Sequence, residues 1–146
     1  MNNKKKAPVR QIKFRGLRVD GKGWVYGYVY LMRGKYYILN IQYEQEGSVI
    51  LDIVIEVIPE TVGQFTGLLD KNGKEIFEGD ILYHDVQGKR VVYYPFAKDV
   101  ASFGLHHIEK CFKSTLQDAS VLYEIISNIH EEIDINSIEG KETNNV

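Results

Sequence analysis

The stretch WVYGYVYL, residues 24–31, decides the fold class, because β-branched and aromatic residues fill almost all of it. Side chains of a strand alternate between its two faces, so the indole and the three phenol rings are expected on one face. This aromatic row consists of Trp24, Tyr26, Tyr28 and Tyr30. The residues between them, Val, Gly, Val and Leu, suit a protein core. The segment is therefore predicted to be a strand with an aromatic outer face.

Short segments of similar character lie on both sides of this strand and are separated by turn signals. The strongest turn is Asn72-Gly73, since Asn-Gly supplies the positive φ that hairpins need. Helical spacing of apolar residues predicts one short helix over 108–116. For 121–129, periodicity favours a helix and the β-branched residues favour a strand. The further predicted strands are 12–15, 36–43, 49–58 and 90–94, and 63–69 is expected to be a short extended segment.

Many short strands with frequent turns predict a mainly β protein, barrel-like or sandwich-like, with antiparallel strands and at most one or two short helices. A barrel is preferred, because the stretch 79–91 reads like strands of an SH3-like barrel. We expect one β-rich domain over 12–135. A flexible basic tail is expected over 1–11, and a polar, disordered tail over 136–146.

The composition is that of a globular protein, with 146 residues, 44% hydrophobic residues and a net charge of −2. This balance favours neither nucleic acid nor membrane as a partner. Residues 1–22 hold eight Lys/Arg and one Asp, and residues 117–146 hold seven Asp/Glu and one Lys. Such ends are either solvated tails or arms for a partner. The N-terminus has no apolar leader, and the single cysteine forms no internal disulfide, so we expect a cytoplasmic protein.

The aromatic row has three interpretations. It fits a second core layer, and it fits a subunit interface, where Tyr and Trp are enriched. It also fits a stacking platform for single-stranded nucleic acid built on Tyr26 and Tyr28. The arginines that would help such a platform are Arg15, Arg18 and Arg33. The overall charge favours a core or an interface.

The acidic segment 70–80 is interpreted as structure rather than chemistry. Its turn residues are Asp70, Asn72, Gly73, Gly79 and Asp80. The aspartate side chain is expected to bond the turn backbone, and the second glycine permits a bend. The ligand order of an EF-hand does not fit this segment. If the protein is an enzyme after all, its best candidates are Glu78 and Asp80.

No other motif names a catalytic or metal site, so no cofactor and no metal are expected. Asp52 and Glu56 would lie about 13 Å apart on a strand, beyond the roughly 5–9.5 Å of glycosidase carboxylate pairs. His107 and Cys111 share helical i, i+4 spacing, but two ligands do not make a zinc site. They fit a surface histidine beside a buried thiol.

The segment 60–82, ETVGQFTGLLDKNGKEIFEGDIL, is distinctive. Three further segments accompany it in order: IKFRG at 12–16, GWVYGYVY at 23–30 and YEIISNIHE at 123–131. Together they resemble the YopX family of bacteriophage and prophage proteins. The chain departs from the family pattern at Ser127, where the family has Gly, and just after it, where the family has Asn-Pro-Glu. No family motif matches 97–120.

The resemblance implies a small, mainly β protein encoded by a phage or prophage, without an established enzymatic activity. It also favours a strand over 121–129, against the periodicity. We therefore expect a non-enzymatic accessory protein that acts by protein–protein interaction, forms a homo-oligomer and contacts a host or phage protein. A small nucleic-acid-binding module with a basic N-terminal arm is the alternative, and an enzyme is the third hypothesis.

Overall fold

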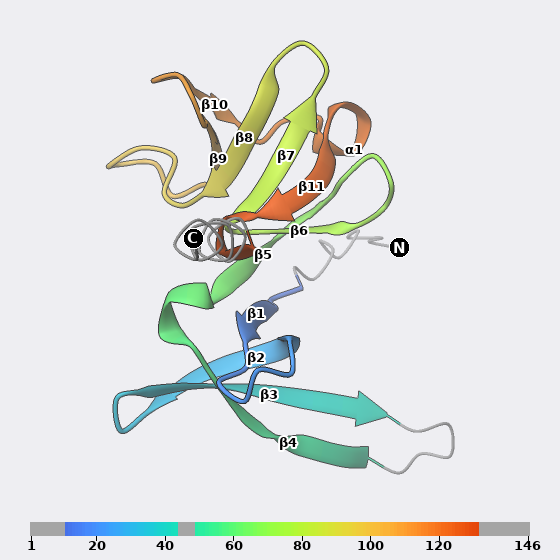
Figure 1. Ribbon diagram of the computed structural model, residues 1–146, viewed down its shortest axis with the longest axis vertical. Helices are drawn as coiled ribbons and strands as arrows, with labels where there is room; N and C mark the ends of the chain where they lie inside the picture. Colours follow the sequence, from blue (N-terminus) through green and yellow to red (C-terminus); the bar gives the residue numbers. More distant parts are fainter. Residues whose placement is uncertain (1–10, 44–48, 132–146) are drawn as a thin grey trace, which may run out of the picture.

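The computed structural model describes residues 11–43 and 49–131, which form two antiparallel sheets (Figure 1). Eleven strands and two short helices lie within these ranges. The strands β1 to β4 gather at one end of the molecule and β7 to β11 at the other, with β5 running between them (Figure 1). The prediction of a mainly β protein with short antiparallel strands is confirmed.

The first sheet has six strands in the order β4-β3-β2-β1-β5-β6. A 3-10 helix, η1, connects β4 to β5 and begins at a proline, which pre-sets a helical φ. The elements are β1 Phe14–Leu17, β2 Trp24–Met32, β3 Lys35–Tyr43, β4 Val49–Val57, η1 Pro59–Thr61, β5 Gly63–Leu69 and β6 Glu75–Phe77.

The first sheet curls, so that the chain leaving β1 meets the end of β4. The Ile58 N–H donates to the Leu17 carbonyl at 2.8 Å, and Arg18 forms an isolated bridge with Val57. A Cβ at Gly16 would stand 2.9 Å from the Val57 side chain, so the close approach of β1 to β4 depends on this glycine. The curl encloses a small apolar cluster centred on the buried side chains of Val25, Ile38 and Val57.

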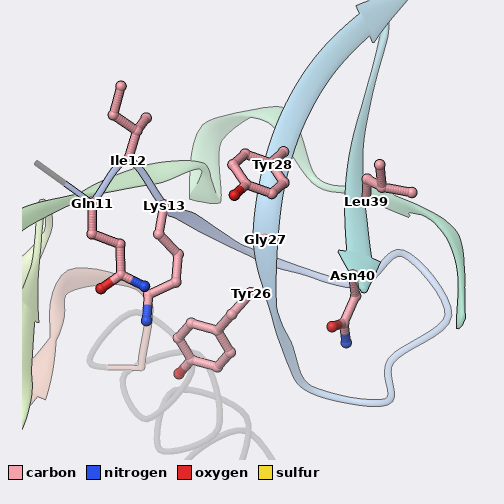
Figure 2. A pocket seen from close by; sticks show the side chains of 8 residues that line it. All are labelled: Gln11, Ile12, Lys13, Tyr26, Gly27, Tyr28, Leu39 and Asn40. Atoms are coloured by element: carbon pink, nitrogen blue, oxygen red, sulfur yellow. The ribbon is translucent and has the colours of Figure 1, made fainter. Parts of the chain in front are cut away.

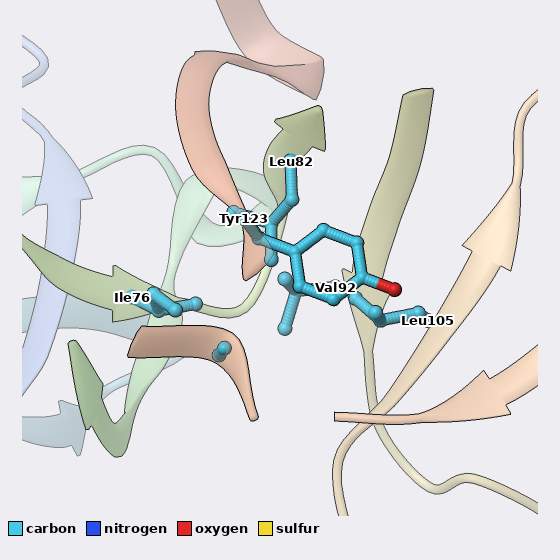
Figure 3. Close-up of a cluster of buried hydrophobic side chains, with 6 residues drawn as sticks. Ile76, Leu82, Val92, Leu105 and Tyr123 are labelled. Carbon is cyan, nitrogen blue, oxygen red and sulfur yellow. The ribbon is translucent and has the colours of Figure 1, made fainter. Parts of the chain in front are cut away.

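The second sheet has five strands in the order β10-β9-β8-β7-β11. One side packs on a larger apolar cluster, which Figure 3 shows around the ring of Tyr123. Ile76 of β6 belongs to this cluster, so a strand of the first sheet helps to bury the second. The elements are β7 Asp80–His84, β8 Gly88–Tyr93, β9 Gly104–His107, β10 Lys113–Thr115, α1 Ala119–Leu122 and β11 Glu124–Asn128.

The preference for a barrel is wrong for the described residues, where neither sheet closes on itself. The stretch 79–91 holds most of a β7–β8 hairpin, and this hairpin is part of an open sheet. The tails expected over 1–11 and 136–146 lie outside the described residues, apart from Gln11.

The helix predicted over 108–116 is also wrong. Residues 104–107 and 113–115 pair as strands β9 and β10, and a turn joins them. The helical spacing of Ile108 and Phe112 does not mark a buried helix face, since their exposed fractions are 42% and 55%. Both expectations for 121–129 hold in part, because α1 ends at Leu122 and the strand β11 follows.

Candidate interaction site

Strand β2 carries the aromatic row on its outer face, as alternation requires. Val25 is buried and Val29 packs against the same core cluster. On the opposite face, Tyr26, Tyr28 and Tyr30 are 44%, 58% and 36% exposed. The row is therefore a surface for most of its length, and not a continuous second core layer.

The pairing of β2 changes in the middle of this row. Residues 24–27 pair with β1, whereas residues 28–32 pair with β3. Gly27 stands at the change, and a Cβ there would collide with the carbonyl oxygen of Leu39. The aromatic row thus has two parts. Trp24 and Tyr26 lie where the two sheets meet, a region called the joint below, whereas Tyr28 and Tyr30 lie on the surface of β2 and β3.

The joint is built around the guanidinium of Arg15 on β1. Its carbon lies 4.6 Å from the ring centroid of Trp24 and 5.1 Å from that of Phe77. One guanidinium nitrogen forms an ion pair with the Asp80 carboxylate at 2.7 Å, and the two side chains are only 8% and 2% exposed. A buried cation stacked on aromatic rings and paired with a carboxylate is a rigid connection between β1 and β7.

Asp80 is held from a second side by the backbone. Its other carboxylate oxygen accepts a hydrogen bond from the Phe77 N–H at 2.8 Å. Burial raises the pKa of Asp80, while the charge of Arg15 and the Phe77 N–H oppose that rise. Sequence reasoning assigned this aspartate to a turn and missed its ion pair, because no local spacing connects β1 to the start of β7.

Tyr26 marks the border between the joint and the outer face. Its ring meets Phe77 edge-on at a centroid distance of 5.4 Å, and burial raises the pKa of its hydroxyl. Tyr26 also lines two neighbouring hollows, of about 350 and 340 Å³. The second hollow reaches the buried Arg15 and Asp80.

The larger hollow, here called the Tyr26 hollow, opens where β2 and β3 part (Figure 2). Its lining residues are Gln11, Ile12, Lys13, Tyr26, Gly27, Tyr28, Leu39 and Asn40. Figure 2 shows the two tyrosine rings on one strand, with Gln11 and Lys13 on one side and Asn40 on the other. Aromatic rings beside amide groups provide contact area and hydrogen bonding, which suits recognition rather than proton transfer.

The second part of the row continues over neighbouring strands as the outer face, defined here by Tyr28, Tyr30, Met32, Tyr37 and Val54. Tyr30 stacks on Tyr37 across the strands with a centroid distance of 5.4 Å. Met32 is 47% exposed and Val54 on β4 is 43% exposed. Sequence alternation found Tyr28 and Tyr30 of this face, whereas Met32 joined it because β2 extends one residue beyond the predicted strand. Tyr37 and Val54 joined it through the register of β2, β3 and β4.

The three arginines proposed to help a nucleic-acid platform are not gathered beside it. Arg15 is buried in the joint. Arg18 donates two hydrogen bonds to the Asp20 carboxylate, at 2.9 and 2.6 Å. Arg33 is exposed in the turn between β2 and β3, with a φ of 51°. Only the last of the three presents its charge outward next to the row, which weakens the nucleic-acid interpretation.

Asp70 lies in the turn between β5 and β6. One carboxylate oxygen accepts the N–H groups of Asn72 and Lys74 at 2.8 and 2.9 Å, and Gly73 supplies a φ of 78°. The other oxygen accepts the N–H of Ile125 on β11 at 3.0 Å. Burial works against ionisation, but these three N–H groups hold the pKa of Asp70 below its ordinary value. Asp70 therefore ties the turn to the second sheet, a role that the sequence did not indicate.

The two carboxylates considered for catalysis do not converge. Gly79, with a φ of 90°, separates them at the bend. Asp80 turns into the joint, whereas Glu78 borders a different hollow of about 280 Å³, and burial raises the pKa of Glu78. The two carboxylates thus lie in different surroundings, and that of Asp80 is already paired with Arg15.

His107 and Cys111, which share helical spacing in the sequence, do not lie on a helix, because His107 ends β9 and Cys111 lies in the turn that follows it. The Nδ1 atom of His107 accepts the N–H groups of Glu109 and Lys110 at 3.1 and 3.2 Å, which fixes the β9–β10 turn. His84 makes the same kind of contact in the β7–β8 turn. Cys111 is exposed, so the expectation of a buried thiol is wrong.

The remaining acidic candidates do not gather either. Glu56 forms an ion pair with Lys35 at 3.3 Å, and the side chain of Asp52 lies outside the described residues. Within 11–43 and 49–131, no group of three or more His, Cys, Asp or Glu side chains is placed to hold a metal ion. The helices in these ranges include none that is long and apolar enough to cross a membrane.

Three comparisons relate the chain to known proteins. A family model described as YopX protein matches residues 13–134. A search of curated proteins gives no match. Among solved structures, the crystal structure of protein EF1440 from Enterococcus faecalis is similar, with a TM-score of 0.52 and 23% identity. The match covers 87% of this chain and 99% of that chain, and at this identity it supports the fold alone.

Proposed function

Because the chain belongs to the YopX protein family, we propose that it is a phage-encoded or prophage-encoded accessory protein that acts by binding protein chains, its own copies included. The observation that carries the proposal is the outer face, where Tyr28, Met32 and Val54 are 58%, 47% and 43% exposed. Adjacent large apolar side chains on a surface mark an interaction site. We propose the cytoplasm of a bacterial host as its place of action.

The chemistry of the outer face favours a protein partner over nucleic acid. Tyrosine and methionine are enriched in protein interfaces, where their rings and chains bury area at little entropic loss. A nucleic-acid platform needs free cations beside the rings. Of the cations near this face, Lys35 is paired with Glu56 and Arg15 is buried with Asp80, whereas Arg33 presents its charge outward from the β2–β3 turn. One outward charge offers little to a phosphate backbone.

We propose no chemical reaction for this protein. The separate surroundings of Glu78 and Asp80 support this, because acid–base catalysis needs its groups within reach of one substrate. The aromatic rings and amides of the Tyr26 hollow extend the outer face and provide contact area for the partner.

Light scattering of the full chain over a wide range of concentrations tests the proposal. We expect a mass above that of one chain, and a smaller mass for the double variant Tyr28→Ser/Tyr30→Ser. Val121→Ser is the matched control, because Val121 is 73% exposed but lies near the second sheet, and it is expected to behave like the wild type. A single-chain mass at every concentration would refute self-association. An unchanged mass in the double variant would refute the outer face as its site.

A further inference from the structure

A second buried arginine, Arg90, lies on the core side of the second sheet. It is on β8, the middle strand of five, and pairs in register with Leu82 on β7 and His107 on β9. Arg90 is 4% exposed, and its neighbour Leu82 is fully buried. A guanidinium therefore occupies a position that would normally hold an apolar side chain.

Among the described residues, the contacts of Arg90 provide no counter-charge. One terminal nitrogen donates to the Ser114 hydroxyl at 2.5 Å, and the guanidinium carbon lies 5.1 Å from the ring centroid of Phe112. The Nε atom is buried and has no hydrogen-bond partner. Throughout the part of the chain that the structure describes, no carboxylate forms an ion pair with Arg90.

Arg15 shows what this site lacks. Both arginines are buried, both lie over aromatic rings, and both have a buried Nε without a partner. Of the two, only Arg15 is paired with a carboxylate of the described ranges, that of Asp80 at 2.7 Å. A guanidinium cannot shed its proton in a protein, so burial of Arg90 without an anion leaves an uncompensated charge, which is strongly unfavourable.

The segment of chain that contains Arg90 carries more positive than negative side chains. Residues 88–116 hold five Lys/Arg and only two Asp/Glu. The Ser114 hydroxyl lies within hydrogen-bond distance of the guanidinium. The Tyr123 hydroxyl donates to Gln87 at 2.8 Å, and burial raises its pKa while the Arg90 charge opposes the rise. Phe112, the ring in contact with the guanidinium, is 55% exposed, so the charge lies one side chain below the surface.

We propose that Arg90 and the Ser114 hydroxyl form a binding site for an oxyanion, the carboxylate or phosphate group of a ligand. Planar guanidinium groups recognise both kinds of oxyanion through paired N–H donors. The bound oxyanion supplies the counter-charge that Asp80 supplies to Arg15. This site is on the second sheet, apart from the outer face, and does not depend on the function proposed for that face.

Thermal unfolding of the full chain with added anions tests the site. Inorganic phosphate and succinate are titrated separately against sodium chloride of equal ionic strength, which distinguishes phosphate from carboxylate. We expect at least one of them to raise Tm saturably, by roughly 2–6 °C at saturation. Arg90→Met should abolish this rise, whereas Lys89→Met, which removes an exposed charge from the neighbouring position, should keep it.

Nitrogen-15 NMR of the wild-type chain keeps the test decisive if Arg90→Met does not fold. The Nε–H signals of Arg15 and Arg90 are assigned from the wild-type spectrum and followed during the same titrations. We expect the Arg90 signal to move saturably and the Arg15 signal to stay. Absence of any saturable shift at Arg90, or a Tm rise that Arg90→Met retains, would overturn the proposal.

Discussion

The two parts of the aromatic row on β2 begin from the same pattern and end in different surroundings. Trp24 packs on Arg15, which pairs with Asp80 of the second sheet, and Tyr26 meets Phe77. The first part of the row therefore lies at the joint between the two sheets. Tyr28 lies on the outer face and is 58% exposed. The difference teaches that alternation assigns side chains to a face, while the elements packed on that face decide whether it becomes an internal joint or a surface for partners.

The largest effect is expected where the joint loses its carboxylate. Asp80→Ala leaves the Arg15 guanidinium buried and unpaired, and should lower the free energy of unfolding by about 3–5 kcal/mol. Urea denaturation measures this value. The double variant Arg15→Met/Asp80→Leu is the control, since it removes both charges and should recover most of the loss. A loss below about 1 kcal/mol for Asp80→Ala would show that the joint is not held by this pair.

A smaller loss, about 1.5–3 kcal/mol, is expected for Asp70→Asn, because an ionised acceptor of three backbone N–H groups is replaced by a neutral one. The folded protein holds the pKa of Asp70 below its unfolded value of about 3.9. Its ionised form therefore stabilises the fold above that value, and the contribution fades as pH falls through the folded pKa. The difference in unfolding free energy between the wild type and Asp70→Asn should become smaller below about pH 4.

Urea denaturation from pH 7 down to about pH 3 checks the Asp70 prediction. Asp85→Asn, in the exposed β7–β8 turn, serves as the control and should follow the wild type at every pH. If the difference in unfolding free energy stayed constant across this pH range, the charge of Asp70 would not contribute to stability.

The two neighbours on either side of Gly27 test the comparison directly. Tyr26→Ala removes the edge-on contact with Phe77 and should cost about 1–1.5 kcal/mol of unfolding free energy. Tyr28→Ala should change stability by less than about 0.5 kcal/mol, because its ring is largely in water. Paired thermal and urea unfolding curves give both values. Equal losses of unfolding free energy for the two variants would mean that Tyr26 and Tyr28 do not differ in how they are packed.

The smallest effect is a gain. Burial raises the folded pKa of Glu78 above its unfolded value of about 4.3, so its ionised form destabilises the fold at higher pH. Stability should fall as pH rises from the unfolded to the folded pKa and stay lower above it. Glu78→Gln removes this penalty and should stabilise the protein by less than about 0.5 kcal/mol at pH 7, as partly exposed positions do, with no gain at pH 3.5.

Urea denaturation at the two pH values measures the Glu78 effect. Glu60→Gln, on the exposed part of η1, is the control and should leave stability unchanged at both. A gain in Glu78→Gln that is the same at both pH values would be a packing effect and not one of ionisation.

Local patterns predicted much of the fold. Alternation placed Tyr26, Tyr28 and Tyr30 on one face, and Asn72-Gly73 marked the β5–β6 turn. These features depend on backbone geometry over a few residues, which the sequence states directly. The helix predicted over 108–116 failed because Ile108 and Phe112 are exposed, while β9 offered a strand partner to residues 113–115.

The sequence by itself determined that this chain forms short strands, where they turn and which side chains share a face, because those properties are set by steric preferences of neighbouring residues. Only the tertiary structure decided that Arg15 meets Asp80, that Asp70 reaches β11 and that Arg90 is buried against the Ser114 hydroxyl. Those outcomes depend on which distant strands come together, and electrostatic pairing acts through space over a few ångströms, whatever the separation along the chain.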